Sequence, residues 1–485
     1  MRDTRPSSFR FLLSAVAAAS LLAACGGQGD EASEPAPEAR PTFQLAPVLP
    51  PEPSDIDADG SETSATLAPG RGSALAAPGA TGEDGESLRQ RILAGGQGEG
   101  TATASAAAAT VYYTPAQVRA AYGLDKLPAS SSANKGAYQG SGQTIAIVGA
   151  YNNPSVATDL ATFNAKLGLP GCAVTPVAAT ATLPLARPVA GSSCTFSVVH
   201  ATSAGGMTTR APAANAGWAT ETAMDVQWAH AMAPAARIVL VQAASASVPD
   251  MTAAIALAGK LGATVVSMSF GATEFSSQAN YEGAFLASGV SYLAASGDSG
   301  RQVSWPAVSS RVLAVGGTTL AASGSTRSET AWAGSGGGIS SFAAVPSWQA
   351  TLRVTGTTGA VAAPVRRVLP DVAFNANPGS GQLIVYAGRW YVAGGTSIGT
   401  PQWAGLVAVA NAVRVLNGKA VLGHLGLPIY RQLNGNATNY AASTLDVKSG
   451  SNGSCKGCAA AAGYDLVTGL GTPNAVKTVE LLTAY

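Results

Sequence analysis

The sequence predicts an α/β fold, in which a parallel sheet is covered by helices on both faces, in one domain over residues 112–485. The first observation is that short, nearly continuous apolar runs alternate with stretches of helical periodicity after residue 112. Such runs are typical of a parallel sheet buried on both faces. The second is that residues 25–111 are rich in Pro, Ala, Gly, Ser and Glu, with little periodicity. Because such a segment buries too little apolar surface to offset its ordering entropy, we expect a flexible tether.

Composition restricts the possible partners. The chain has 485 residues, of which only 11% are charged, and its formal net charge is +1. A nucleic-acid-binding protein would normally carry a basic face, so we expect no nucleic-acid partner. The length suffices for a large core or for two to three average domains.

Residues 1–24 have the features of an export signal. Three arginines precede an apolar run over residues 11–22, which is too short for a comfortable membrane span. The following Leu22-Ala23-Ala24-Cys25 resembles a bacterial lipobox, which implies cleavage before Cys25 and a lipid on its sulfur. An ordinary secretory signal with an incidental cysteine is the alternative. We expect an exported protein, either a cell-envelope lipoprotein or an extracellular one, with membrane attachment only through a lipid on Cys25.

If Cys25 carries a lipid, four cysteines remain for pairing. An even number in an exported chain suggests disulfides, most simply Cys172–Cys194 and Cys455–Cys458, although the connectivity stays open. The second pair also has the spacing of a redox or zinc site. With no second such pair and no nearby histidine, a zinc site would have too few ligands.

The order of elements in residues 112–485 follows from turn signals and apolar periodicity. Thr114 is expected to cap the first helix, with Pro115 at its first position. A loop-rich insert is expected at about 168–217. Strands are predicted at 144–148, 237–241, 264–269, 290–295, 311–315 and 383–386, and helices at 115–122, 156–166, 220–232, 250–261, 278–288 and from the small-residue turn at 394–397 onward. In such sheets the working residues gather at the carboxyl ends of the strands.

Glu221 and Asp225 are the first candidate functional residues. Their spacing of four places both carboxylates on one face of the predicted helix, and that face continues into Trp228 and Met232. Burial and mutual repulsion should raise the pKa of at least one of them. A solvated helix face is the alternative.

Asp298 is the second candidate, because Ser296-Gly297-Asp298-Ser299-Gly300 follows a predicted buried strand directly. A carboxylic acid kept protonated there could donate a hydrogen bond to a developing oxyanion. The alternative is a turn residue that bonds its own backbone.

Ser397 is the candidate nucleophile. A turn of small residues, Gly394-Gly395-Thr396-Ser397, runs from a predicted strand into a long apolar helix. Glycine allows a tight turn and close approach of a substrate, and the amides of a helix N-terminus favour negative charge near the hydroxyl. The alternative is that Thr396 or Ser397 only caps the helix, with Pro401 early in it.

Other serine hydrolase patterns fit less well. Gly395-Thr396-Ser397-Ile398-Gly399 also matches the nucleophile elbow of α/β-hydrolases, but that fold needs an acid and then a histidine downstream. Only His424 follows Ser397. His200 and His230 lack the His-Gly-Thr context of an ordinary subtilisin, so we expect them to be structural. Gly297-Asp298-Ser299-Gly300 occurs in chymotrypsin-like enzymes, whose fold is all-β.

These motifs, in this order, resemble those of the sedolisins, the serine-carboxyl peptidases. The match consists of Glu221 with Asp225, the Asp298 motif, Gly395-Thr396-Ser397 followed by Pro401, and a tail running from Leu445-Asp446-Val447 to Gly471-Thr472-Pro473. It covers roughly residues 112–485, and Tyr113-Thr114-Pro115 looks like the family's mature start. The resemblance implies a subtilisin-like fold and an acid-active peptidase, with protein or peptide substrates.

The resemblance also implies roles for individual residues. Ser397 would be the nucleophile that forms an acyl-enzyme, Glu221 the general base, Asp225 the acid that orients and tunes Glu221, and Asp298 the oxyanion-site acid. A structural Ca²⁺ would lie in region 445–473. Its ligands would be the carboxylates of Asp446 and Asp465 and the carbonyls of Val447, Ala461 and Gly463, an all-oxygen set that suits this ion. The insert with Cys455 and Cys458 falls inside this loop.

One departure concerns activation. Sedolisins usually carry a folded propeptide, whereas here only the tether precedes residue 112; it offers a possible short helix at 86–94, with Arg89 and Arg91 as a processing point. We expect a monomer. The alternatives to a peptidase are an inactive surface lipoprotein that binds peptides, and a serine esterase that uses Ser397.

Overall fold

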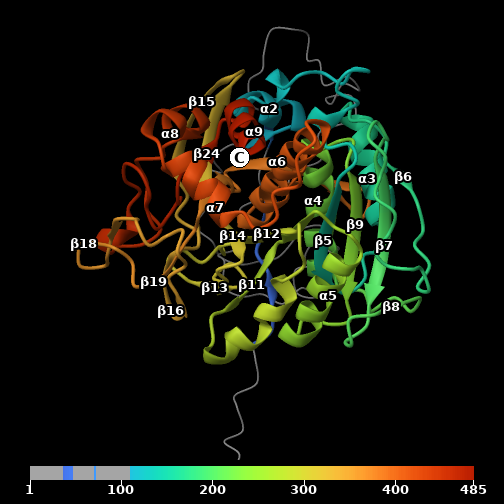
Figure 1. Cartoon of the computed structure of the whole chain (residues 1–485), viewed down its shortest axis with the longest axis horizontal. Coiled ribbons are helices and arrows are strands. Elements are labelled where there is room, and N and C mark those ends of the chain that lie inside the picture. Colours follow the sequence, from blue (N-terminus) through green and yellow to red (C-terminus); the bar gives the residue numbers. More distant parts are fainter. Residues whose placement is uncertain (1–36, 47–69, 73–109) are drawn as a thin grey trace, which may run out of the picture. The chain divides into compact units, whose positions relative to one another are not determined.

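The computed structural model describes residues 37–46, 70–72 and 110–485, which belong to one compact unit. The predicted signal segment, Cys25 and the possible helix at 86–94 lie outside the described residues. A ten-stranded sheet runs through the protein in the order β15-β14-β12-β10-β5-β9-β7-β6, with β20 beside β14 and β8 beside β7 (Figure 1). Pairings from β14 through to β6 are parallel, and only β15 and β8 join antiparallel.

The strands of this sheet have the following bounds: β5 Thr144–Ala150, β6 Ala173–Val174, β7 Thr195–Ala201, β8 Met207–Thr208, β9 Arg237–Ala243, β10 Val265–Met268, β12 Ser291–Ala295, β14 Val312–Ser323, β15 Thr326–Ala331 and β20 Val372–Asn375.

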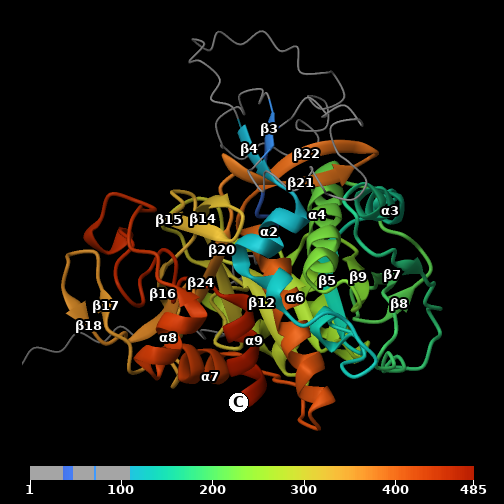
Figure 2. The same ribbon diagram turned by 90° about the horizontal axis from the view of Figure 1, so that it is seen from above.

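Helices cover the sheet on both faces, as the sequence predicted. Alternate residues of β5 point to opposite sides: Ile145 and Ile147 belong to one apolar core, and Ala146 and Val148 to another. The first core lies under α2, α3, α4, α6 and α9, and the second under α5 and the 3₁₀ helix η3. Figures 1 and 2 show α4 beside α6, with α5 across the strands from them. Their bounds are α2 Pro115–Tyr122, α3 Val156–Lys166, α4 Ala216–Met232, α5 Val248–Lys260, η3 Ser276–Phe285, α6 Thr396–Leu416 and α9 Ala475–Ala484.

The predicted elements are present, with differences in the insert and in one helix. Thr114 caps α2 in a capping box with Gln117, and α3 has the predicted bounds. The expected loop-rich insert contains β7, a seven-residue strand that pairs with β9 and was missed. The helix predicted at 278–288 is a 3₁₀ helix over 276–285. The long helix predicted after the turn of small residues begins at Thr396, so Ser397 lies at a helix start as expected.

A second sheet has five strands in the order β2-β22-β21-β4-β3, seen at the top of Figure 2. It contains three pieces of the segment expected to be a flexible tether: residues 44–46, residues 70–72 and the first two residues of β4, 110–111. The strands are β2 Gln44–Ala46, β3 Gly70–Gly72, β4 Thr110–Tyr113, β21 Ser380–Tyr386 and β22 Arg389–Gly394. A smaller sheet joins β1 Arg40–Pro41, β11 Phe270–Thr273 and β13 Ser304–Trp305. Residues 37–46 are therefore paired with the folded domain.

Short elements complete the described chain. The strand pairs are β16 Gly338–Ala344 with β19 Arg366–Leu369, β17 Val354–Thr355 with β18 Val361–Ala362, and β23 Thr444–Leu445 with β24 Thr472–Pro473. The helices are η1 Leu124–Lys126, η2 Ala137–Gln139, α7 Gly426–Ile429, the π-helical η4 Tyr430–Asn434, α8 Ala437–Ser443 and η5 Lys456–Cys458. The disulfides Cys172–Cys194 and Cys455–Cys458 are both present, which confirms the expected pairing.

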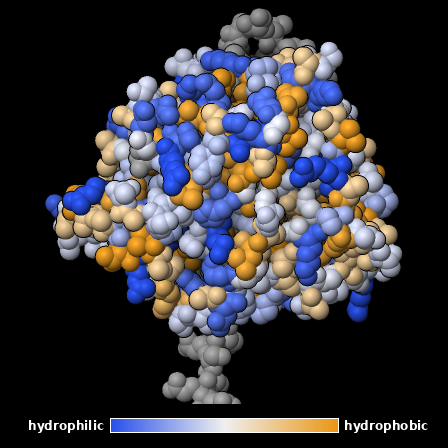
Figure 3. Space-filling view, viewed as in Figure 1, coloured by the Kyte–Doolittle hydropathy of each residue, from blue (hydrophilic) through white to orange (hydrophobic). Residues whose placement is uncertain are grey.

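Apolar and polar residues are interspersed on the face drawn in Figure 3. Within the part of the chain that the structure describes, no helix combines the length and apolar character needed to cross a membrane.

Candidate active site

Ser397 is the second residue of α6, two positions after the glycine that precedes the helix. Gly395 is the N-cap residue and has no side chain with which to cap the helix. Its φ of 112° is one that L side chains rarely adopt. The hydroxyl of Ser397 is therefore free of a capping role. The Ser397 side chain is fully buried.

Glu221 reaches Ser397 from the neighbouring helix α4, and Asp225 lies one turn further along that helix. Both carboxylates are buried, which excludes the solvated helix face that the sequence left open. A Cβ atom at Gly405 would lie 2.4 Å from the Cβ of Met232, so the missing side chain lets α6 approach α4 closely. This close packing brings together residues 176 positions apart in the sequence.

The Ser397 hydroxyl faces the Glu221 carboxylate. Ser397 Oγ lies 3.1 Å from Glu221 Oε2 and 3.1 Å from the carbonyl oxygen of Ser269. The Ser269 hydroxyl in turn donates to the carbonyl oxygen of Ser397 at 3.1 Å. A hydroxyl bonded to a carboxylate is arranged to pass its proton to that carboxylate.

The two acids on α4 have pKa values raised well above their ordinary range. Burial is the main cause for both; for Glu221 the nearby charge of Asp225 adds to it, and the hydroxyl of Ser397 opposes it. A buried pair of this kind resists losing both protons, because two like charges in a low-dielectric site repel each other. The pair is thus suited to holding one proton.

Asp298 lies three residues after the carboxyl end of β12 and faces the start of α6. Its Oδ1 atom accepts hydrogen bonds from the backbone N–H and the hydroxyl of Thr396, both at 2.8 Å. Its Oδ2 atom is buried and has no hydrogen-bond partner. Burial raises the pKa of Asp298 to about 7, although the bonds from Thr396 oppose the rise. Asp298 is therefore largely neutral below pH 7, and its Oδ2 can carry a proton to donate.

Gly395 joins Asp298 and Ser397 into one cradle. A Cβ atom at Gly395 would lie 2.5 Å from Asp298 Oδ2 and 2.6 Å from the carbonyl oxygen of Thr42. The same carbonyl oxygen accepts a hydrogen bond from the Ser397 backbone N–H at 3.1 Å. A backbone N–H and an acid oxygen are thus placed around one carbonyl oxygen, which is the arrangement of an oxyanion site.

Two of the three histidines have partners away from Ser397. The Nε2 atoms of His230 and His424 lie 2.8 Å from the carbonyl oxygens of Pro170 and Ser310. Burial lowers the pKa of His230 to about 4, so this ring stays neutral in its structural role. The titratable side chain that contacts Ser397 is a carboxylate, that of Glu221.

The region expected to bind calcium brings its two acids to one loop. Asp446 accepts from the N–H of Gly463 at 3.1 Å, and Asp465 accepts from the N–H of Ala461 at 3.1 Å. Burial raises the pKa of Asp465 to about 6, against four opposing hydrogen bonds. A buried carboxylate without a neighbouring positive charge fits a site for a hard cation. The Lys448 ammonium group lies 3.4 Å from Asp446, but its side chain is 63% exposed and can leave.

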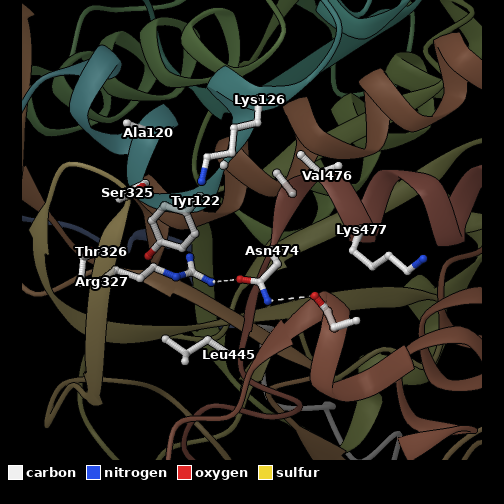
Figure 4. Close-up of a pocket in the computed structure, with 14 residues that line it drawn as sticks. Ala120, Tyr122, Lys126, Ser325, Thr326, Arg327, Leu445, Asn474, Val476 and Lys477 are labelled. Atoms are coloured by element: carbon white, nitrogen blue, oxygen red, sulfur yellow. Dashed lines mark hydrogen bonds between the residues drawn. The ribbon is translucent and has the colours of Figure 1, made fainter. Parts of the chain in front are cut away.

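A separate pocket lies between α2, β15 and the start of α9 (Figure 4). Arg327, one of three cationic residues that line it, donates to the carbonyl oxygen of Pro473 and to Asn474. Its guanidinium also stacks over the ring of Tyr122, 4.2 Å from the ring centroid. These contacts hold α9 in place, and no candidate catalytic residue lines the pocket.

The sequence analysis missed three contributors to the site. Ser269 directly follows β10, so the rule that working residues gather at strand carboxyl ends could have found it. Thr396, which holds Asp298, was considered only as a cap. Thr42 carried no local signal, because it lies in the low-complexity segment.

Comparison with known proteins gives related matches. Residues 200–417 match the subtilase family, peptidase S8. Over 290 residues the chain is 33% identical to kumamolisin from Bacillus sp. (strain MN-32), which covers 54% of this chain and 50% of that protein. Over 196 residues it is 35% identical to sedolisin from Pseudomonas sp. (strain 101), which covers 38% of this chain and 30% of that protein. The chain thus matches half or less of the length of these relatives.

The structural match covers more of the chain than the sequence matches do. A solved structure of Pseudomonas sedolisin, a serine-carboxyl proteinase in complex with two molecules of pseudo-iodotyrostatin, superposes with a TM-score of 0.59 and 26% sequence identity. The match covers 76% of this chain and 97% of that one.

Proposed function

The chain belongs to the sedolisin family, and we propose that it is a serine-carboxyl peptidase that cleaves peptide bonds in proteins or peptides under acidic conditions. The observation that carries the proposal is the 3.1 Å contact between the Ser397 hydroxyl and the buried carboxylate of Glu221. A binding protein would have no need of a nucleophile, a paired base and an oxyanion cradle in one place.

Ser397 acts as the nucleophile. Its Oγ atom adds to the carbonyl carbon of the substrate, and its proton passes to Glu221. Glu221 then gives this proton to the amine as the C–N bond of the substrate breaks. The acyl part of the substrate stays on Ser397 as an ester. Water hydrolyses the ester, with Glu221 again accepting a proton. Asp225 orients Glu221 and tunes its proton affinity.

Asp298 and the backbone N–H of Ser397 stabilise the oxyanion. The backbone donor is available at every pH, whereas Asp298 donates only when it is protonated. Because the pKa of Asp298 is about 7, the cradle is complete below neutrality. Acid activity follows, provided that Glu221 has lost its proton at the working pH.

Calcium is the second part of the proposal. The carboxylates of Asp446 and Asp465, with the carbonyls of Val447, Ala461 and Gly463, would hold one structural Ca²⁺. The ion would fix the loop over residues 446–465, which carries the Cys455–Cys458 disulfide. Its site is separate from Ser397, and we assign it no chemical step.

We also propose that the protein is exported and that a lipid on Cys25 is its membrane anchor. The signal-like sequence and the Leu22-Ala23-Ala24-Cys25 motif support this. Mass spectrometry of the N-terminal peptide from cell envelopes tests it, since a lipid would add its mass to Cys25.

Hydrolysis of a denatured protein by the full chain from pH 3 to pH 8 tests the peptidase. The variants are Ser397→Ala and Glu221→Gln, with Glu480→Gln as the matched control, because Glu480 is an exposed glutamate paired only with Lys477. We expect activity that rises toward acid, is lost in the first two variants and is kept in the control. Activity that persists in Ser397→Ala would refute the proposal.

A further inference from the structure

The pocket between α2, β15 and the start of α9 is lined by cationic side chains and by no acid. Lys126, Arg327 and Lys477 belong to its wall, and none of the described residues that form this wall is Asp or Glu. The whole chain has nearly equal numbers of basic and acidic residues, 28 and 27, so the wall departs from the average. Its volume of about 520 Å³ lies within the range of about 300–1,000 Å³ that is usual for small-molecule sites.

Arg327 has a hydrogen-bond donor that no protein group uses. Its Nη2 atom donates to the carbonyl oxygen of Pro473 and to Asn474, but its Nη1 atom is buried and has no hydrogen-bond partner among the described residues. The side chain is only 6% exposed. Figure 4 shows the Lys126 side chain reaching toward Tyr122 and this guanidinium. A buried cationic donor without an acceptor costs free energy unless a ligand supplies one.

Glu329 is the carboxylate closest to this guanidinium, but it leaves Nη1 free. Its Oε2 atom lies 3.9 Å from Nε of Arg327, on the other edge of the group. Its oxygens already accept from the hydroxyls of Tyr122 at 2.5 Å, Thr318 at 2.8 Å and Thr472. Because Glu329 is satisfied by these hydroxyls, Arg327 keeps the capacity to bind an anion in the pocket.

The first turn of α9 brings backbone donors to the same pocket. Residues 474–477 belong to the wall. Asn474 is the N-cap residue of this ten-residue helix, yet no side chain caps it. The Asn474 side chain instead accepts from Arg327 and donates to the carbonyl oxygen of Ala442. The first N–H groups of a helix have no partner within the helix, and they favour an anion.

Lys126 and Lys477 differ in their capacity to bind a ligand. Lys126, at the end of η1, is exposed and forms no ion pair within residues 110–485 or the two shorter described segments. Lys477 pairs with Glu480 at 2.8 Å, and in Figure 4 its ammonium group points away from the other cations. Lys126 is therefore the lysine that can complete the site.

We propose that this pocket binds a phosphate monoester. Nη1 of Arg327, the ammonium group of Lys126 and the first amides of α9 offer donors from three elements. A phosphate monoester presents three strong acceptor oxygens, whereas a carboxylate presents two. Leu445 and Val476, in the same wall, would contact the organic part. The ligand would join η1 and β15 to the last helix, so it would stabilise the folded chain without any part in the chemistry of Ser397.

Calorimetric titration of the full chain tests the proposal, in a Ser397→Ala background that prevents proteolysis. The ligands are glycerol 1-phosphate, inorganic phosphate and acetate at equal ionic strength and about pH 7.5, where a phosphate monoester carries close to two negative charges. We expect saturable binding of glycerol 1-phosphate that is tighter than that of inorganic phosphate or acetate. The melting temperature should rise with the logarithm of its concentration.

Lys126→Gln and Lys477→Gln form the matched pair of variants. Lys126→Gln should weaken binding of glycerol 1-phosphate by about tenfold or more, because it removes a charge-assisted hydrogen bond, whereas Lys477→Gln should change it by less than about threefold. Arg327→Gln should also remove binding, but it loses the contacts with Pro473 and Asn474 as well, so the Lys126 variant decides the test. Equal affinities of Lys126→Gln and the unchanged chain, an equal loss in both lysine variants, or tighter binding of inorganic phosphate than of the ester would each overturn the proposal.

Discussion

Replacing Asp298 with Asn should change how activity depends on pH. Burial holds the pKa of Asp298 at about 7, against about 3.9 for an ordinary aspartate. That difference corresponds to a preference of about 4 kcal/mol for the neutral form. At pH 8 only about one molecule in ten would carry the proton that Oδ2 donates, so wild-type kcat/KM should fall about tenfold for each pH unit above 7.

The Asn side chain keeps the contacts of Asp298 but removes its titration. Its Oδ1 can still accept from the N–H and hydroxyl of Thr396, and its NH₂ takes the place of the protonated Oδ2. Asp298→Asn should therefore retain activity at acidic pH and lose the fall above pH 7. Asp298→Ala lacks any donor, so below pH 7 its kcat/KM should lie about 10²–10³-fold under the wild-type value.

The assay measures kcat/KM on an uncharged chromogenic peptide from pH 3 to pH 9, with the purified full chain. Stability must be followed in parallel. A carboxyl with a raised folded-state pKa makes the unfolding free energy fall as pH rises from about 4 to 7, by about 1.4 kcal/mol per unit. Urea titrations should show this slope in the wild type and less of it in Asp298→Asn. If the alkaline fall persists in a folded Asp298→Asn variant, the assignment of Asp298 to the oxyanion site is wrong.

Three further predictions concern the neighbouring features. Burial is the largest cause that raises the pKa of Glu221, and the charge of Asp225 is the second. Asp225→Asn should therefore move the acidic limb of the kcat/KM profile to lower pH and reduce kcat. An acidic limb that does not move would show that Asp225 does not tune the pKa of Glu221. Removal of Ca²⁺ with a chelator should lower the unfolding free energy, by about 2.7 kcal/mol if the ion had been present at 100 times its Kd. This stabilisation should weaken as the pH falls, because a proton competes with Ca²⁺ for Asp465, and a chelator-insensitive melting temperature would argue against the site. Gly405→Ala places a Cβ atom 2.4 Å from that of Met232, so it should cost about 1–3 kcal/mol in urea unfolding, whereas Ala at the exposed Gly418 tests only backbone conformation.

Local periodicity predicts the regular, packed elements of this chain better than its irregular ones. Periodicity identified the buried strands and α3, because a strand or helix that packs on a core repeats its apolar residues locally. It missed β7, because this strand lies in a segment of turns and short polar residues, where its pairing with β9 decides its conformation. It also gave an α-helix at 278–288 where tertiary contacts produce a 3₁₀ helix.

The sequence by itself determined the candidate chemistry: a hydroxyl at a glycine turn before a helix, two acids on one helical face, and an acid at the end of a buried strand. These signals are local, so they can be read from neighbouring residues. Only the tertiary structure decided that the Glu221 face is buried, that it meets Ser397 across two helices, and that Asp298 shares a cradle with the Ser397 N–H. It also placed Thr42 in that cradle, because the pairing of residues 40–41 with β11 and of residues 44–46 with β22 is made through the backbone and can be formed by many sequences. Low-complexity residues carry no local pattern that would reveal such a partner.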